Sequence, residues 1–234
     1  RVDWAAEFCG LGGGGVGDPG PGGSGLAAPD TFLLLEAGRI GATATSPDGV
    51  VVVFDDLSSR LVVLSDDGHF SRFGGPGSGP GEFAGGAVGV ERDHVSASGQ
   101  SYLVFDGARI HEFDRAGRPL FSRSLAELGI PRIHLVGLRS TVDAHFVGVM
   151  EWSFASPDRR LHIHRWSGGS LEPIGGIPLT PLARLSSGGW TWRRFLPMPL
   201  WDVAGGCAVL SDGSSPEIVV LSLESGESRA FRIE

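Results

Sequence analysis

Lysine and asparagine are both absent from this 234-residue sequence, so all 19 basic residues are arginine. A chain without lysine has neither a Schiff-base lysine nor the lysine of a phosphate-binding loop. A chain without asparagine has no acceptor for N-glycosylation. These absences exclude several classes of enzyme and one common surface modification.

Positive charge and long apolar runs are also scarce. The 19 basic residues face 27 acidic ones, which gives a net charge of −8, and Arg159-Arg160 and Arg193-Arg194 are only local basic pairs. Because nucleic-acid affinity depends on clustered basic side chains that neutralise phosphates, we expect no nucleic-acid partner. No apolar run reaches the roughly 18 residues that cross a bilayer, so we expect no membrane span.

The sequence contains two cysteines, Cys9 and Cys207. Two are too few for a disulfide framework or for a zinc site made of cysteine ligands. They either pair with each other, which requires the two ends of the chain to meet, or remain separate thiols. The sequence leaves both possibilities open.

Glycine and proline, in contrast, are abundant, with 38 and 15 residues. Both mark turns, so we expect many short elements in one domain and no long helix. Residues 1–30 are predicted to form an N-terminal strand at 2–8 followed by a Gly/Pro-rich linker, because residues 10–30 have almost no bulky side chains to bury.

An internal repeat organises residues 31–234. The segment VVVFDDLSSRLVVLSDDG (51–68) aligns with YLVFDGARIHEFDRAG (102–117), and weaker copies occur at 147–169 and 207–226. Each copy has an apolar strand, an acidic residue, a polar turn and a second strand, and further apolar segments flank it on both sides. The first flanking segments are at 39–45, 87–91, 133–138 and 195–203, and the last are at 69–73, 119–125, 171–179 and 228–233.

Four strands per repeat predict an all-β fold, a β-propeller of four-stranded antiparallel blades. The recurring acidic residues are Asp55, Asp106, Glu151 and Asp212, at an average spacing of about 52 residues. Aspartate at the end of a strand accepts hydrogen bonds from its own turn, so we interpret these residues as turn formers. The alternative is that they hold a hard cation through carboxylate oxygens.

The segment RFGGPGSGPGEF (72–83) follows the first hairpin directly. In this respect the chain resembles the NHL-type and related six-bladed, TolB-like β-propellers, in which a Gly-Pro-Gly-Glu-Phe segment links successive blades. The resemblance implies a bacterial protein of the periplasm or the cell exterior. Six blades would need roughly 310 residues, and about four are visible. The chain is thus part of a six-bladed propeller, has another blade number, or carries a degenerate blade in its first 38 residues.

The loops that join the second and third strands of each repeat, and those that join successive repeats, are expected on one face. Two of them are long and rich in tryptophan and arginine: an enlarged loop at 152–160 and the connection at 181–194. We predict a ligand-binding patch there, because exposed Trp and Arg dominate binding hot spots; the alternative is that the tryptophans pack between blades. The residues of this predicted patch are Trp152, Trp190, Trp192, Arg193 and Arg194.

Histidines offer one further candidate, because His162 and His164 would share one face of a strand. That spacing can bind metal, but no third ligand is evident, so an ordinary strand face is the favoured interpretation. We identify no catalytic residue, nucleotide loop or resident cofactor. The sequence therefore favours a non-enzymatic propeller that binds a protein, peptide or glycan on its loop face. The alternative is a hydrolase or lyase of the gluconolactonase-like or amidoglycolate-lyase-like kind, with Ca²⁺ or Zn²⁺ at the channel.

Overall fold

The structure is a computed structural model, and it describes residues 40–65, 68–84, 95–130, 135–153, 156–180 and 199–232. For residues 152, 153, 156 and 157 it describes the backbone only. The predicted N-terminal strand and linker, residues 1–30, lie outside this part of the chain. The described residues form strands and turns without any helix, so none of their segments is a helix able to cross a membrane.

Sixteen strands form four sheets of four. The first sheet contains β1 (Ile40–Thr45), β2 (Val51–Asp55), β3 (Arg60–Leu64) and β4 (Phe70–Phe73), and the second contains β5 (Val95–Ala97), β6 (Ser101–Phe105), β7 (Arg109–Asp114) and β8 (Pro119–Ser124). The third contains β9 (Leu135–Ser140), β10 (His145–Ser153), β11 (Ser156–Ser167) and β12 (Ser170–Leu179), and the fourth contains β13 (Leu200–Ala204), β14 (Cys207–Ser211), β15 (Glu217–Ser222) and β16 (Ser228–Arg232).

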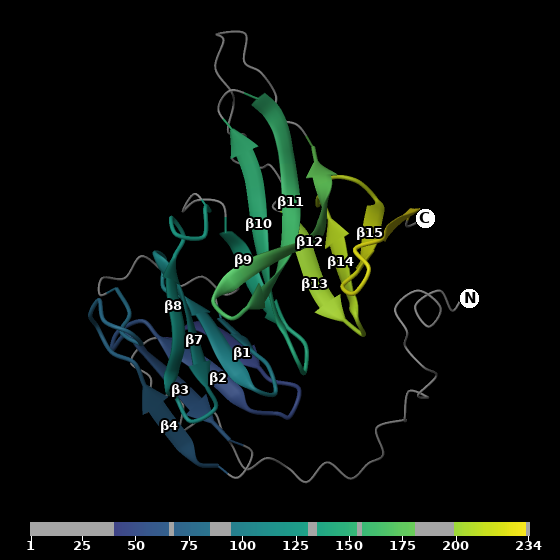
Figure 1. Cartoon of the computed structure of the whole chain (residues 1–234). Coiled ribbons are helices and arrows are strands. Elements are labelled where there is room, and N and C mark those ends of the chain that lie inside the picture. The colour runs from purple at the N-terminus through teal and green to yellow at the C-terminus, as the bar shows by residue number, and fades with distance from the viewer. Residues whose placement is uncertain are drawn as a thin grey trace, which may run out of the picture.

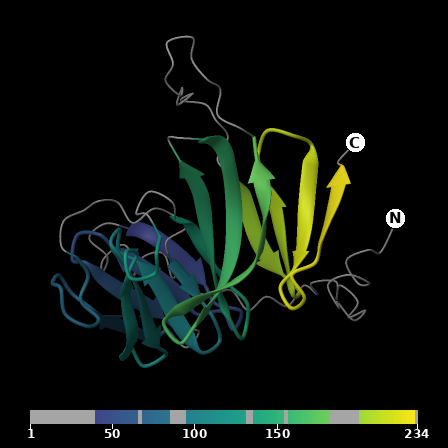
Figure 2. The ribbon, with the colours of Figure 1, turned by 45° about the horizontal axis from the view of Figure 1, so that its top comes forward.

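Each sheet is a blade whose strands pair antiparallel in chain order. The blades follow one another along an arc, with the first and the last at opposite ends (Figures 1 and 2). The first strand of each blade is innermost: β5 lies beside both β1 and β9, and β9 lies beside β13. The described chain is thus a four-bladed β-propeller, which confirms the predicted fold class.

Apolar side chains fill the junctions between successive blades. Strand alternation turns Val52, Phe54 and Leu61 of the first blade toward the second, where they form one buried cluster with Tyr102. Phe83, from the connection between the two blades, meets the Phe54 ring edge to face at 5.0 Å. Each such buried side chain contributes about 1.5–3 kcal/mol. Comparable clusters occupy the other two junctions.

Two predicted segments differ from the structure. The segment 87–91, expected to be the first strand of the second blade, lies outside the described residues, and that strand is β5 instead. β5 escaped detection because it is short and because its central residue, Ser96, is polar although buried. The predicted loop at 152–160 was also wrong: antiparallel pairing continues through Trp152↔Arg159 and Ser153↔Ser156, so β10 and β11 form one long hairpin.

Cys207, in β14, is buried and disulfide-bonded rather than a free thiol. Cys9, the second cysteine of the sequence, lies outside the described residues.

Candidate functional site

The loop face is defined here as the edge of the blades that carries the β2–β3, β6–β7 and β14–β15 turns. An aspartate begins each of these turns, as the repeat predicted. Asp55 is the last residue of β2, and its carboxylate accepts hydrogen bonds from Leu57 N at 3.0 Å and Ser58 Oγ at 2.6 Å. The interpretation of this aspartate as a turn former is therefore confirmed.

Asp106 does more than form its turn. Its Oδ1 accepts from the backbone N–H groups of Ala108 and Arg109 at 2.8 and 2.7 Å. Its Oδ2 accepts from Ala84 N at 2.9 Å, within the connection from the first blade, and lies 3.0 Å from His111 Nε2. Burial alone would raise the pKa of Asp106, but these hydrogen bonds lower it to about 2. The Asp106 carboxylate thus links the connection between the first two blades, at Ala84, to the second blade by a hydrogen bond.

Asp212 repeats this arrangement in the fourth blade. Its Oδ1 accepts from Ser214 N and Ser215 N at 2.8 and 3.0 Å. Its Oδ2 accepts from Ser214 Oγ at 2.7 Å and from Thr180 Oγ1, at the end of the third blade, at 2.6 Å. Burial opposes ionisation, yet the hydrogen bonds hold the pKa of Asp212 well below its usual range.

Glu151 departs from the pattern, because it lies inside β10 and not at the start of a turn. It is exposed, and its Oε2 lies 2.9 Å from His162 Nε2. His162 and His164 share one face of β11 with ring centroids 6.3 Å apart, as predicted. Burial, and secondarily His162, lower the pKa of His164. Within the described residues no three His, Cys, Asp or Glu side chains converge as a metal site would require.

The third blade is the largest. β10, β11 and β12 have 9, 12 and 10 residues, whereas the strands of the other blades have 3–6. The β10–β11 hairpin therefore rises beyond the neighbouring blades (Figure 1). Of the predicted patch, Trp152 lies in this hairpin, although only its backbone is described. Trp190, Trp192, Arg193 and Arg194 lie outside the described residues, so the patch itself stays a prediction.

Sequence reasoning missed Arg159, which it treated only as half of a local basic pair. Arg159 lies in β11 and is 6% exposed, and its Nε donates to the Thr180 carbonyl at 3.2 Å. Its Nη2 is buried and has no hydrogen-bond partner. Burial lowers the pKa of this guanidinium, and attraction to Asp212 offsets the effect in part. The sequence did contain a sign of this burial. Arg159 is two and four residues from Leu161 and Ile163, and strand alternation places all three side chains on one face.

A second buried polar cluster joins the second and third blades. His145, in β10, lies 2.9 Å from Ser96 Oγ through Nδ1 and 2.9 Å from Ser101 Oγ through Nε2. Ser101 donates to Glu112 Oε1 at 3.0 Å, and Trp166 Nε1 donates to Glu112 Oε2 at 2.7 Å. Because Ser101 gives its proton to Glu112, it accepts from His145 Nε2–H, which leaves Nδ1 to accept from Ser96. Every group in this chain has a partner.

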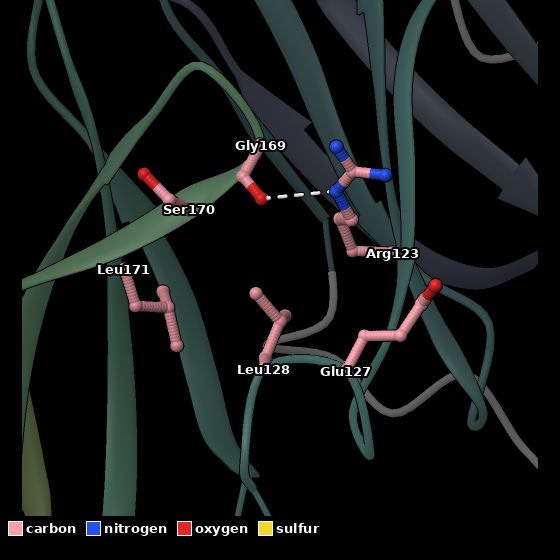
Figure 3. A pocket seen from close by; sticks show the side chains of 6 residues that line it. All are labelled: Arg123, Glu127, Leu128, Gly169, Ser170 and Leu171. Carbon is pink, nitrogen blue, oxygen red and sulfur yellow. Dashed lines mark hydrogen bonds between the residues drawn. The ribbon is translucent and has the colours of Figure 1, made fainter.

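A pocket of about 320 Å³ opens at the outer edge of the same junction (Figure 3). It is lined by Arg123, Glu127, Leu128, Gly169, Ser170 and Leu171. Its polar groups are largely engaged: Arg123 Nε donates to the Gly169 carbonyl at 3.3 Å, and Glu127 accepts from Ser124 N and Oγ at 2.7 and 2.8 Å. Glu127 N also donates to Ser124 Oγ at 3.2 Å, and these reciprocal hydrogen bonds order the turn at 124–129. The pocket is thus a weaker candidate than the loop face.

No family model and no curated protein matches this sequence. Among solved structures, a chain of the nidogen/laminin complex is 14% identical with a TM-score of 0.41, and the match covers 83% of this chain and 80% of that one. AztD from Citrobacter koseri, in its apo form, is 13% identical with a TM-score of 0.49, over 85% of this chain and 48% of that one. Virginiamycin B lyase from Staphylococcus aureus is 13% identical with a TM-score of 0.41, over 82% and 55%.

The chain spans about half the length of the last two proteins. At these identities and TM-scores the matches carry no argument about activity, ligand or partner. The classification of this chain as a β-propeller rests on its own four sheets.

Proposed function

We propose that this chain is a non-enzymatic binding module, which recognises a protein, peptide or glycan on its loop face at the junction of the third and fourth blades. The protein would act in the bacterial periplasm or outside the cell. The disulfide at Cys207 supports an oxidising compartment. The position on the loop face also agrees with the predicted patch, since the connection at 181–194 leaves the third blade directly after Thr180.

The observation that carries this proposal is the length of the β10–β11 hairpin. Met150 and Leu161, an opposed pair in this hairpin, belong to the apolar cluster with the fourth blade. Antiparallel pairing continues beyond them through Glu151↔Arg160 and Trp152↔Arg159. A hairpin that a rigid scaffold extends on its loop face is typical of a binding element.

The test begins with the biotinylated protein on peptide and glycan arrays, followed by calorimetric titration of the ligands that bind. We expect the double variant Trp190→Ala/Arg193→Ala to weaken that binding by about tenfold or more, because buried Trp and Arg anchors dominate interface energies. Leu57→Ala is the matched control. Leu57 is 74% exposed in the β2–β3 turn, on the same face but in the first blade.

Unchanged affinity in the Trp190/Arg193 double variant would count against the proposed patch. Equal loss of affinity in the Leu57 variant would move the binding surface away from the third and fourth blades.

A further inference from the structure

Arg159 lies where the apolar junction between the third and fourth blades reaches the loop face. It is opposed by Leu179 in β12 and shares its sheet face with Leu161 and Ile163, which pack against the fourth blade. The residue is 6% exposed, and its Nη2 has no contact with water. A buried charge is unfavourable unless it is paired and hydrogen-bonded.

Its hydrogen bonds are incomplete. A guanidinium has five N–H donors, and Arg159 uses Nε toward the Thr180 carbonyl at 3.2 Å. Nη2 is buried without a partner, and among the described residues no carboxylate forms an ion pair with Arg159. A buried donor left without a partner is rare, and it indicates either an ordered water or a group that arrives from outside.

The carboxylate that attracts Arg159 does not fill this role. Asp212 attracts Arg159, yet its two oxygens already accept from the backbone N–H groups of Ser214 and Ser215 and from the hydroxyls of Ser214 and Thr180. The two hydroxyls are also hydrogen-bonded to each other, so Asp212 accepts at least three hydrogen bonds. A carboxylate accepts about four hydrogen bonds, so little of the capacity of Asp212 remains. Asp212 is therefore committed to its turn and to Thr180, and the open donors of Arg159 stay available.

We propose that Arg159 receives a carboxylate group of the ligand that binds at the junction of the third and fourth blades. This inference rests on the proposed binding function of the loop face, and it adds that the ligand has a carboxylate group. A carboxylate matches the planar fork of arginine. It is favoured over phosphate because Asp212 is ionised nearby, and a dianion would meet twice the repulsion of a monoanion. The carboxylate comes from an acidic peptide or from an acidic sugar.

The experiment measures thermal shift and calorimetric affinity of the whole chain with small probes at constant ionic strength. The α-amide of N-acetylglutamate, which has one carboxylate, is compared with the α-amide of N-acetylglutamine, which has none, and glucuronate is compared with glucose. Each carboxylate then has a neutral counterpart, and the two sources are separated. Inorganic phosphate forms a third arm. We expect one or both carboxylates, but neither neutral probe, to raise the melting temperature, because a ligand that binds only the folded state stabilises it.

Arg159→Met is expected to weaken carboxylate binding by about tenfold to a hundredfold, which corresponds to the loss of a charged hydrogen bond. Arg160→Met is the matched control, since Arg160 is the next residue, is exposed, and points to the opposite sheet face. Arg159→Lys keeps the charge but loses the planar fork of donors. Its affinity for the carboxylate probes is therefore expected to lie between that of Arg159→Met and that of the native chain. This lysine variant also keeps the test valid if the methionine variant folds poorly.

Equal binding of the acids and their neutral counterparts would overturn the proposal, as would full binding by both Arg159 variants. A response to phosphate alone would overturn the choice of carboxylate. If no probe binds and Arg159→Met is less stable than the native chain, Arg159 is a structural residue bonded to water, and the proposal fails. A ligand found on the arrays whose binding depends on Trp190 and Arg193 but not on Arg159 would overturn this inference and leave the proposed function intact.

Discussion

The two junctions that flank the third blade use buried polar groups in opposite ways. At the junction with the second blade, His145 joins Ser96 and Ser101, and the chain of hydrogen bonds closes on Glu112. At the junction with the fourth blade, Arg159 keeps a buried Nη2 without a partner. A complete network stabilises the packing of two blades, whereas an incomplete one retains binding capacity. Under the proposal above, the first junction is structural and the second binds the ligand.

The largest expected effect comes from breaking the complete network. His145→Ala should lower the free energy of unfolding by about 4 kcal/mol, because it leaves a cavity and removes the partner of the buried Ser96 hydroxyl and one of the two partners of the Ser101 hydroxyl. His162→Ala is the control, since His162 is partly exposed and bonds only to the exposed Glu151; it should cost less than about 1 kcal/mol. Urea unfolding measures both values. Similar losses of unfolding free energy in the two variants would refute the structural role assigned to the His145 network.

Acidification should weaken the same junction. Burial lowers the pKa of His145 from 6.5 to about 4, and hydrogen bonding at Ser101 offsets this only in part. The unfolded chain therefore binds the proton first, so stability is full above pH 6.5 and is lost as the pH falls toward 4, by roughly 3 kcal/mol. Asp106, whose pKa is about 2, contributes only to losses below pH 3.8, the ordinary pKa of an aspartate.

Urea unfolding at a series of pH values between 7 and 4 tests this assignment. His145→Gln, which does not titrate, should flatten the profile across that window. An unchanged slope in the glutamine variant would assign the pH dependence to other groups.

The incomplete junction should respond differently to loss of its charge. In a ligand-free chloride buffer, Arg159→Met should leave the free energy of unfolding within about 1 kcal/mol of the native value or raise it, because an unpaired buried charge is replaced by an apolar chain. The measurement is urea unfolding in parallel with His145→Ala. A loss as large as that of the histidine variant would remove the difference between the two junctions.

Divalent cations should have the smallest effect. Added Ca²⁺, Zn²⁺ or EDTA should shift the melting temperature by less than about 1 °C, because the oxygens of Asp106 and Asp212 are already taken up by hydrogen bonds. Metal analysis of the purified chain accompanies the thermal scan. A stoichiometric cation whose removal lowers the melting temperature would support the metal-dependent hydrolase or lyase, and lactone and ester substrates would be tested next.

Local features of the fold were predictable because they depend on neighbours in sequence. Alternating apolar residues gave the strands of the first repeat, and Asp55, Asp106 and Asp212 were correctly interpreted as turn formers. The hairpin of the third blade was not predicted, since its serine- and proline-containing tip has the composition of a loop although strand pairing continues on both sides of it. The short β5 was missed for a related reason: Ser96 breaks its apolar pattern, and only His145, 49 residues away, explains why Ser96 is buried.

By itself, the sequence determined the four-stranded repeat, its antiparallel pairing and the acidic turns, because strand period and turn chemistry act over a few residues. The tertiary structure decided which polar side chains meet between blades. Arg159 and Asp212 are separated by a whole connection and lie close only because two blades pack face to face. Whether such groups saturate one another depends on the geometry of that packing, and no local pattern in the chain encodes it.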